Sequence, residues 1–431
     1  MAEPTNTPFP PSTPVPASTP RSLSPAPLIP SLAPDASMTT VPLSIRLSPP
    51  SAPKAKLKVL HIGDPIKYNP ELYAEFSSTF DVIRPLTPER ERSAFIQALK
   101  DKKWGDFSAI FRPFWGTGGE MGRWDTELID LLPDSVKVFA SAGAGFDWAD
   151  TKLLGEKGII YCNSGLAAAE AVADFAVAMI ISTFRHLPWC IGAATFSPPS
   201  ASSEGQTRER MFQLCHAEAT LVSHNPRNHT LGFIGFGNIG QQIAAKLGNP
   251  AFGMKILYFD VVRKAPAVET QLGATFCLSL EELLSKTDCI VLCTPASPDG
   301  QPIITKERLG RVKAGARFVN IARGSLVDEE ALADALQEGR LSAAALDVHA
   351  DEPRVNERLV DMAGLGLTGG LSTSGGMVQN PGRAMLSCHN AGGTVETHAG
   401  FEELSMKNIL AVLGGGEAIT PVNLHFLRKE D

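Results

Sequence analysis

The chain has 431 residues, 43% hydrophobic and 20% charged, which is typical of a soluble globular protein with room for two domains. A formal net charge of −7 without any basic block argues against a nucleic-acid partner. The seven cysteines show no C-x-x-C spacing, so the sequence predicts no metal site and favours free thiols in a reducing compartment.

The first segment, residues 1–55, differs from the rest of the chain because it contains 15 of the 33 prolines, mixed with Ser, Thr and Ala. Such a stretch buries too little apolar surface to offset its ordering entropy, which predicts a disordered Pro/Ser-rich leader. A mitochondrial presequence is the alternative. It requires an Arg-rich amphipathic helix, and the prolines forbid that helix.

After the leader, apolar runs typical of strands alternate with helical periodicity. The predicted strands are 57–64, 80–83, 107–111, 136–140 and 158–161, and the clearest helices between them are 89–100 and 125–132. Strands that alternate with helices indicate a parallel sheet with helices on both faces.

A long apolar segment, 164–184, follows and has about the length needed to cross a bilayer. It carries Glu170 and Asp174 one helical turn apart, and two carboxylates near a bilayer centre are costly. The sequence therefore predicts a helix buried between two domains and no membrane partner.

A second alternating series begins after Asn228. Its predicted strands are 230–234, 255–259, 289–293, 317–321 and 343–346, and its predicted helices are 239–247, 280–286 and 328–338. Two patches rich in Gly and Ser, 197–205 and 364–382, are predicted to be loops. The whole pattern is that of an α/β protein with two doubly wound parallel-sheet domains.

A glycine turn, Gly235-x-Gly237-x-x-Gly240, links the predicted strand 230–234 to the helix after it. This context makes the motif a dinucleotide-binding fingerprint. Gly235 permits the tight turn, Gly237 lets the backbone approach a pyrophosphate, and Gly240 allows close helix–strand packing. Asn238 and Ile239 begin the helix, where free N–H groups bind phosphate.

The acidic residue Asp260 closes the next strand, 20 residues after Gly240. Its carboxylate is expected to accept hydrogen bonds from the ribose hydroxyls and to repel a 2′-phosphate, which favours NAD. Arg263 and Lys264 follow directly, so NADP stays open as the alternative cofactor.

Three residues past the later strands have the chemistry needed to reduce a 2-oxo acid. Arg323 has a planar, charged fork that can hold the substrate carboxylate. His389 can supply the proton for the new hydroxyl near neutral pH. Glu352 can hold the imidazole in place, and a cofactor would bring the hydride.

Several motifs resemble the D-isomer-specific 2-hydroxyacid dehydrogenase family from residue 58 to about residue 423. They are the glycine turn within 233–240, the segment 319–328 and the segment 345–348. Within the family, 137–148 and 223–229 are similar to fungal D-mandelate dehydrogenases, and glyoxylate/hydroxypyruvate reductases are the other close members. The resemblance implies an NAD(P)-dependent dehydrogenase that acts on a small 2-hydroxy or 2-oxo acid.

The same resemblance implies how the chain is organised. It makes 56–163, completed by 394–431, a flavodoxin-like substrate domain, with a Rossmann NAD-binding domain inserted at 164–393. It implies a cytoplasmic homodimer. It also carries over site roles: Arg323, Glu352 and His389 are catalytic, Ala144 and Gly145 with Arg323 bind the substrate carboxylate, and Thr294, Ile321, Ala322, Arg323 and Asp347 contact the nicotinamide.

One departure from the family lies before His389. Here 37 positions separate Glu352 from His389, whereas the family keeps them under about 20 apart, and the extra length is the patch 364–382. A tolerated loop is one interpretation. Two alternatives remain: an enzyme impaired by this insertion, and an NAD-sensing, corepressor-like binding protein on the same scaffold.

Overall fold

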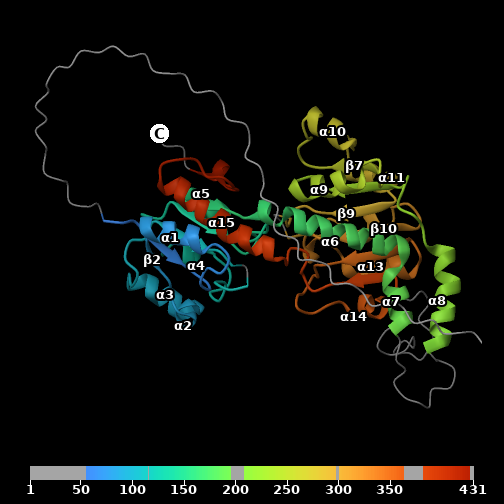
Figure 1. Cartoon of the computed structure of the whole chain (residues 1–431), viewed down its shortest axis with the longest axis horizontal. Coiled ribbons are helices and arrows are strands. Elements are labelled where there is room, and N and C mark those ends of the chain that lie inside the picture. Colours follow the sequence, from blue (N-terminus) through green and yellow to red (C-terminus); the bar gives the residue numbers. More distant parts are fainter. Residues whose placement is uncertain (1–54, 115, 196–207, 298–299, 364–381, 428–431) are drawn as a thin grey trace, which may run out of the picture. The chain divides into compact units, whose positions relative to one another are not determined.

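The computed structural model describes residues 55–114, 116–195, 208–297, 300–363 and 382–427. In this part of the chain the strands form two separate parallel sheets (Figure 1). The predicted leader lies outside the described residues except for Ala55. The predicted loop 197–205 and residues 364–381 of the second Gly- and Ser-rich patch also lie outside them.

The first sheet has the strand order β2-β1-β3-β4-β5, and every pairing is parallel. This is the flavodoxin-like order 2-1-3-4-5. Its strands are β1 (Lys58–His61), β2 (Asp81–Ile83), β3 (Ala109–Arg112), β4 (Val138–Ser141) and β5 (Ile160–Cys162). The surrounding helices are α1 (Pro70–Thr79), α2 (Thr87–Arg90), α3 (Arg92–Lys100), α4 (Thr126–Ile129), α5 (Thr151–Glu156), α15 (Val395–Leu413) and the 3₁₀ turn η2 (Leu424–Phe426).

Apolar side chains cover both faces of this sheet because successive strand residues point to opposite sides. Ile110 and Phe139 belong to the core beneath α3, α4 and α5, whereas Phe111 and Val138 belong to the core beneath α1 and α15. The C-terminal helix α15 is therefore a part of the N-terminal sheet's packing.

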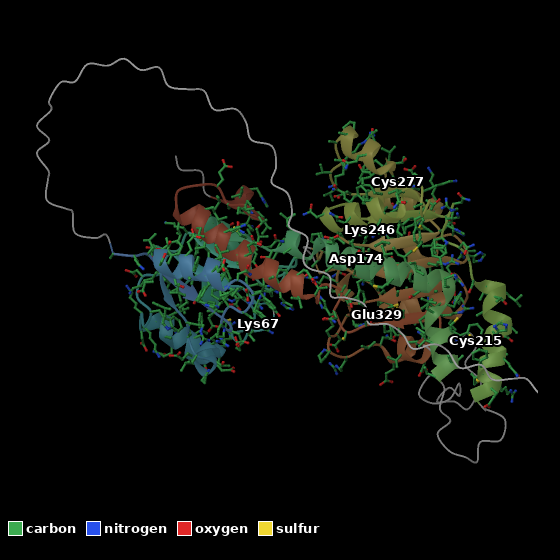
Figure 2. All side chains as sticks on the ribbon, in the orientation of Figure 1. Lys67, Asp174, Cys215, Lys246, Cys277 and Glu329 are labelled. Atoms are coloured by element: carbon green, nitrogen blue, oxygen red, sulfur yellow. The ribbon has the colours of Figure 1, made fainter. Side chains whose placement is uncertain are left out.

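A buried carboxylate on α15 fixes the loop that precedes α1. Glu402 accepts hydrogen bonds from the backbone N–H groups of Lys67 at 2.8 Å, Tyr68 at 2.8 Å and Asn69 at 3.0 Å. Glu402 is fully buried, so these donors offset the cost of removing its charge from water. These hydrogen bonds connect α15 to residues 67–69, which lie more than 330 positions earlier in the sequence (Lys67 is labelled in Figure 2).

The second sheet has the order β12-β11-β10-β9-β6-β7-β8, again with all pairs parallel. This is the Rossmann arrangement with one extra strand. Strands β7 and β8 are added on one side of β6 and strands β9 to β12 on the other, so the order of addition reverses between β6 and β9. Its strands are β6 (Thr230–Ile234), β7 (Lys255–Phe259), β8 (Ala274–Phe276), β9 (Cys289–Leu292), β10 (Ala316–Asn320), β11 (Leu341–Leu346) and β12 (Ala384–Leu386). The two-sheet fold predicted from the sequence is confirmed.

Helices pack on both faces of the second sheet. One core contains side chains of α6 and α9, and the other contains side chains of α11, α12, α13 and α14. The elements are α6 (Gly165–Arg185), α9 (Asn238–Leu247), α10 (Pro266–Leu272), α11 (Leu280–Lys286), α12 (Lys306–Leu309), η1 (Gly324–Leu326), α13 (Glu329–Gln337) and α14 (Glu357–Met362).

The long helix α6 has the length and apolar composition of a membrane-spanning helix. In the structure it packs against α9, β10, β11 and α15. Its two acidic residues meet a partner from α9: Lys246 Nζ lies 2.8 Å from Asp174 and 3.7 Å from Glu170 (Figure 2). The carboxylates that argued against a bilayer therefore form ion pairs between helices.

The predicted single helix 89–100 is wrong, because the chain forms two helices, α2 and α3, that break at Glu91. Glu91 has an extended conformation, with φ −56° and ψ 137°. Its neighbours explain the break: Arg90 is buried and binds Glu120 at 2.6 Å, whereas Arg92 binds Asp125 at 2.9 Å. These tertiary ion pairs override the helical periodicity of the segment.

Two helices after α6 were not predicted from the sequence, α7 (Leu187–Thr195) and α8 (Arg208–Val222). They pack on one another through a small core of their own that includes Trp189 and Met211. Large apolar side chains remain exposed on this pair, including Ile191, Phe212, Leu221 and Val222.

Candidate active site

The loops that follow β4, β10, β11 and β12 surround one cavity of about 400 Å³. Loops at the carboxyl ends of parallel strands are where such folds bind ligands. The lining contains Ala144, Gly145, Ile321, Arg323, Asp347, Glu352 and His389, all of which the sequence analysis singled out. The cavity size is typical of a small-molecule site.

The glycine turn has the geometry that a dinucleotide requires. Gly235 has φ +87°, and a Cβ there would lie 2.8 Å from the carbonyl oxygen of Cys293. A Cβ on Gly240 would lie 3.1 Å from the oxygen of Gly235, which explains the tight helix–strand packing. A Cβ on Gly237 would meet no atom within 4 Å, so the space above this residue is open to a pyrophosphate. The helix that starts at Asn238 and Ile239 supplies the N–H groups.

The predicted ribose ligand, Asp260, lies at the end of β7 beside this turn. Its Oδ2 accepts a hydrogen bond from the backbone N–H of Phe236 at 2.9 Å and lies 2.9 Å from Lys264 Nζ. Burial alone would raise the pKa of the Asp260 carboxyl, but Lys264 and the Phe236 N–H outweigh burial and hold that pKa below its usual range. Asp260 is therefore an anion at neutral pH.

The predicted nicotinamide contacts lie on the three loops that follow β9, β10 and β11. Thr294 follows β9, and its Cα lies 3.0 Å from the position that a Cβ on Gly235 would take. Ile321 and Ala322 follow β10, and Ile321 lines the cavity. The amide of Asn320 shapes this loop, because its Oδ1 accepts from the Ala322 N–H at 3.0 Å and its Nδ2 donates to the Arg323 oxygen at 3.0 Å.

Arg323 reaches from the β10 loop to the loop after β4. Its Nε donates to Asp147 Oδ1 at 3.0 Å, and its Nη1 donates to the oxygen of Ala322 at 2.7 Å. A Cβ on Gly145 would lie 1.2 Å from Arg323 Nη2, so a side chain at this position would force the guanidinium to move. The structure thus brings Arg323 and Gly145 into direct contact.

The loop at Ala144 and Gly145 is held by the two residues that precede α6. Asn163 Nδ2 donates to the oxygen of Ala144 at 2.8 Å, and Ser164 N donates to the oxygen of Gly143 at 2.9 Å. Within the described residues, no hydrogen bond uses the backbone N–H of Ala144 or Gly145. A substrate carboxylate is a suitable acceptor for both groups.

Glu352 and His389 form a hydrogen-bonded pair in the cavity wall. His389 Nδ1 lies 2.9 Å from Glu352 Oε2, and Glu352 Oε1 accepts from the His349 N–H at 2.9 Å. Burial raises the pKa of Glu352, but the bonds from His389 and His349 prevail and hold it below its usual value. The two side chains are therefore in contact although they lie 37 positions apart in the sequence.

Asp347 holds the loop that carries His389. Its carboxylate accepts from Ser387 Oγ at 2.7 Å, from Asn390 N at 2.9 Å and from Ala391 N at 2.8 Å. Its backbone oxygen accepts from the His389 N–H at 2.7 Å. His389 itself has φ +52°, a strained conformation for a residue with a side chain, which persists only where the surroundings enforce it.

Sequence reasoning missed several residues of the site. Asp147 pairs with Arg323, Asn320 shapes the Arg323 loop, and Ser387 bonds Asp347. Asp147 lies within the family-like segment 137–148, which was the available signal for it. Arg112, Trp148 and Phe401 also line the cavity, and the Arg112 guanidinium lies 4.7 Å from the Trp148 ring.

Comparisons with known proteins identify the family to which a chain with this site belongs. Residues 200–369 match the family described as D-isomer specific 2-hydroxyacid dehydrogenase, NAD binding domain. The chain is 31% identical over 335 residues to 4-methyl-2-oxopentanoate reductase A of Aspergillus oryzae, covering 78% of this chain and 89% of that protein. It is 33% identical over 301 residues to the glyoxylate reductase of Thermococcus kodakarensis, covering 70% and 80%.

A solved structure shares the fold as well. The holo form of D-mandelate dehydrogenase from Rhodotorula graminis has 35% sequence identity and a TM-score of 0.75, covering 85% of this chain and 98% of that one. Fold and cavity define an oxidoreductase that uses a nicotinamide dinucleotide. The chain belongs to the D-isomer specific 2-hydroxyacid dehydrogenase family, and it carries out NAD(P)-dependent reduction of 2-oxo acids.

The open space at Gly237 gives a sharp test of cofactor binding. Gly237→Ala adds a methyl group that meets no protein atom within 4 Å, so the melting temperature without cofactor should stay unchanged. The methyl should obstruct the pyrophosphate and raise the Kd for NADH about 10-fold or more, measured by cofactor fluorescence. Gly235→Ala, which collides with Cys293, should lower the melting temperature too. Unchanged NADH affinity in Gly237→Ala would place the cofactor elsewhere.

Proposed function

We propose that this enzyme reduces 2-oxo acids with a sizeable apolar substituent, such as phenylglyoxylate or 4-methyl-2-oxopentanoate, to the D-2-hydroxy acids. The supporting observation is the cavity itself. Arg323, Glu352 and His389 line it with polar groups, and Trp148, Val172 and Phe401 line it with apolar surface. Glyoxylate has no substituent with which to cover that surface.

The named relatives agree with this choice. One is a 4-methyl-2-oxopentanoate reductase by name and another is a D-mandelate dehydrogenase, although glyoxylate reductases are similar to the chain as well. Burial of an aliphatic or phenyl substituent contributes roughly 1.5–3 kcal/mol, which corresponds to a preference of about 10- to 100-fold.

In this mechanism the protein positions the acid and moves one proton. The N–H groups of Ala144 and Gly145 and the Arg323 guanidinium bind the substrate carboxylate and polarise the carbonyl. A nicotinamide cofactor, when bound, would supply the hydride. His389 donates a proton from Nε2 to the carbonyl oxygen, while Glu352, bonded to Nδ1, orients the ring.

The two alternatives from the sequence have less support. The distance of 2.9 Å between His389 Nδ1 and Glu352 Oε2 argues against an active site disrupted by the segment 364–382. A corepressor-like binding protein has no need for an apolar cavity beside a charged triad, so the reductase is the function we propose.

A substrate panel tests the proposal directly. Purified full-length chain is mixed with NADH or NADPH and with glyoxylate, hydroxypyruvate, phenylglyoxylate or 4-methyl-2-oxopentanoate, and cofactor oxidation is followed at 340 nm. We expect kcat/KM for the two bulky acids to exceed that for glyoxylate at least about 10-fold. A highest kcat/KM with glyoxylate would contradict the proposed specificity. No oxidation with any acid would contradict the function.

The proton donor can be tested separately. His389→Ala should lower kcat by about 10²–10⁴-fold because the carbonyl oxygen loses its proton source. The Kd for NADH should stay within about 2-fold, since His389 belongs to the substrate side of the cavity. Exposed His425 supplies the matched control, and His425→Ala should behave as the native chain. Equal losses of kcat and NADH affinity in His389→Ala would contradict the assigned role.

We also propose that the enzyme is a cytoplasmic homodimer. The exposed Phe212 and Leu221 on α8, with Ile191 on α7, supply apolar surface of the kind that interfaces cover. All seven cysteines are free thiols, in keeping with a reducing compartment. Sedimentation equilibrium should give twice the 46.0 kDa of one chain, and Leu221→Glu should lower that mass. A native chain that sediments as a monomer would exclude the dimer.

A further inference from the structure

Two adjacent basic residues follow the ribose-binding acid, and the structure assigns them different partners. Lys264 Nζ lies 2.9 Å from Asp260 Oδ2. Arg263 turns to Glu269 instead, with Nε 2.9 Å from Oε1 and Nη2 2.8 Å from Oε2. The Arg263 guanidinium also lies 5.7 Å from the Phe276 ring, so its charge is already matched away from the ribose site.

We infer that Lys264 sets the cofactor selectivity of this enzyme, and that its ammonium group lets the site accept NADPH as well as NADH. The inference rests on the proposed nicotinamide-dependent function and deepens it. A lone carboxylate at this position repels a 2′-phosphate, whereas a nearby cation accommodates one. Here the negative Asp260 carboxylate and the positive Lys264 ammonium group lie side by side. Their charges nearly cancel where a 2′-hydroxyl of NADH or a 2′-phosphate of NADPH would bind.

The surroundings of Asp260 and Lys264 strengthen the electrostatic influence of this pair on a bound cofactor. The side chains of Asp260 and Lys264 are 16% and 24% exposed, so bulk salt screens the pair only partly. The Phe236 N–H, which belongs to the glycine turn, donates to the carboxylate and holds it beside that turn. Lys264 is held in turn, because its backbone N–H donates to the Tyr258 hydroxyl at 2.9 Å. The ion pair with Asp260 thus holds the ammonium group beside the carboxylate that is predicted to bind the ribose.

The Asp260–Lys264 pair also predicts how the affinity for NADH should change when Lys264 is replaced. The hydroxyls of an unphosphorylated ribose are neutral, and their hydrogen bonds go to Asp260, so loss of Lys264 should leave them largely intact. A 2′-phosphate carries negative charge and gains a charge-assisted hydrogen bond only from the ammonium group. Lys264 should therefore influence the two cofactors unequally.

The test compares Kd values of the full chain for NADH and for NADPH, measured by cofactor fluorescence. Lys264→Met should raise the Kd for NADPH about 10-fold or more and change that for NADH less than about 2-fold. Lys264→Arg, which keeps the charge, should retain NADPH binding. Arg263→Met is the matched control and should change the ratio of the two Kd values less than about 3-fold, because Glu269 already holds Arg263.

Each outcome has a definite meaning. An unchanged ratio of Kd values in Lys264→Met, or a larger effect from Arg263→Met, overturns the assignment to Lys264. A native chain that binds NADH but not NADPH overturns the inference and leaves the proposed function standing. A native chain that binds neither cofactor overturns the proposed function itself. Melting temperatures without cofactor show whether each variant is folded.

Discussion

The buried carboxylate of Asp347 is the constraint on which the geometry of the active site depends. Asp347 directly follows β11 and is buried, and its carboxylate accepts three hydrogen bonds from the segment 387–391. An anion in such a place is costly unless donors surround it, so the loop must fold around it. That requirement holds His389 in its left-handed conformation and brings its ring to Glu352. By resemblance Asp347 was assigned to the nicotinamide; in the structure its carboxylate oxygens already have protein donors.

The sheets could be predicted from the sequence because strands buried on both faces are continuous apolar runs. The predicted segments 230–234 and 255–259 coincide with β6 and β7. Helices were less predictable where long-range ion pairs decide the backbone. Nothing local in 89–100 shows that Arg90 binds Glu120 and Arg92 binds Asp125, and those pairs produce the break at Glu91.

The residues of the candidate site also differ in how well the sequence predicts them. Arg323, Glu352 and His389 were visible because they follow strands, and parallel strands end at one edge. Asp147 was hidden as a partner of Arg323, since the two residues are 176 positions apart. Trp148 and Phe401, which line the cavity, were likewise not singled out from the sequence.

The position of α15 has a consequence for biosynthesis. Met406 and Ile409 of this helix fill the core beneath β1, β3 and β4, and Glu402 bonds the loop before α1. His389 also precedes this helix by only a few residues. Strands β1, β3 and β4 therefore stay incompletely covered during synthesis until α15 has been made, so the first sheet cannot complete its folding before the second sheet has been synthesised. Their apolar surface is exposed to chaperones and to aggregation until α15 emerges, and catalysis can begin only after that helix has docked.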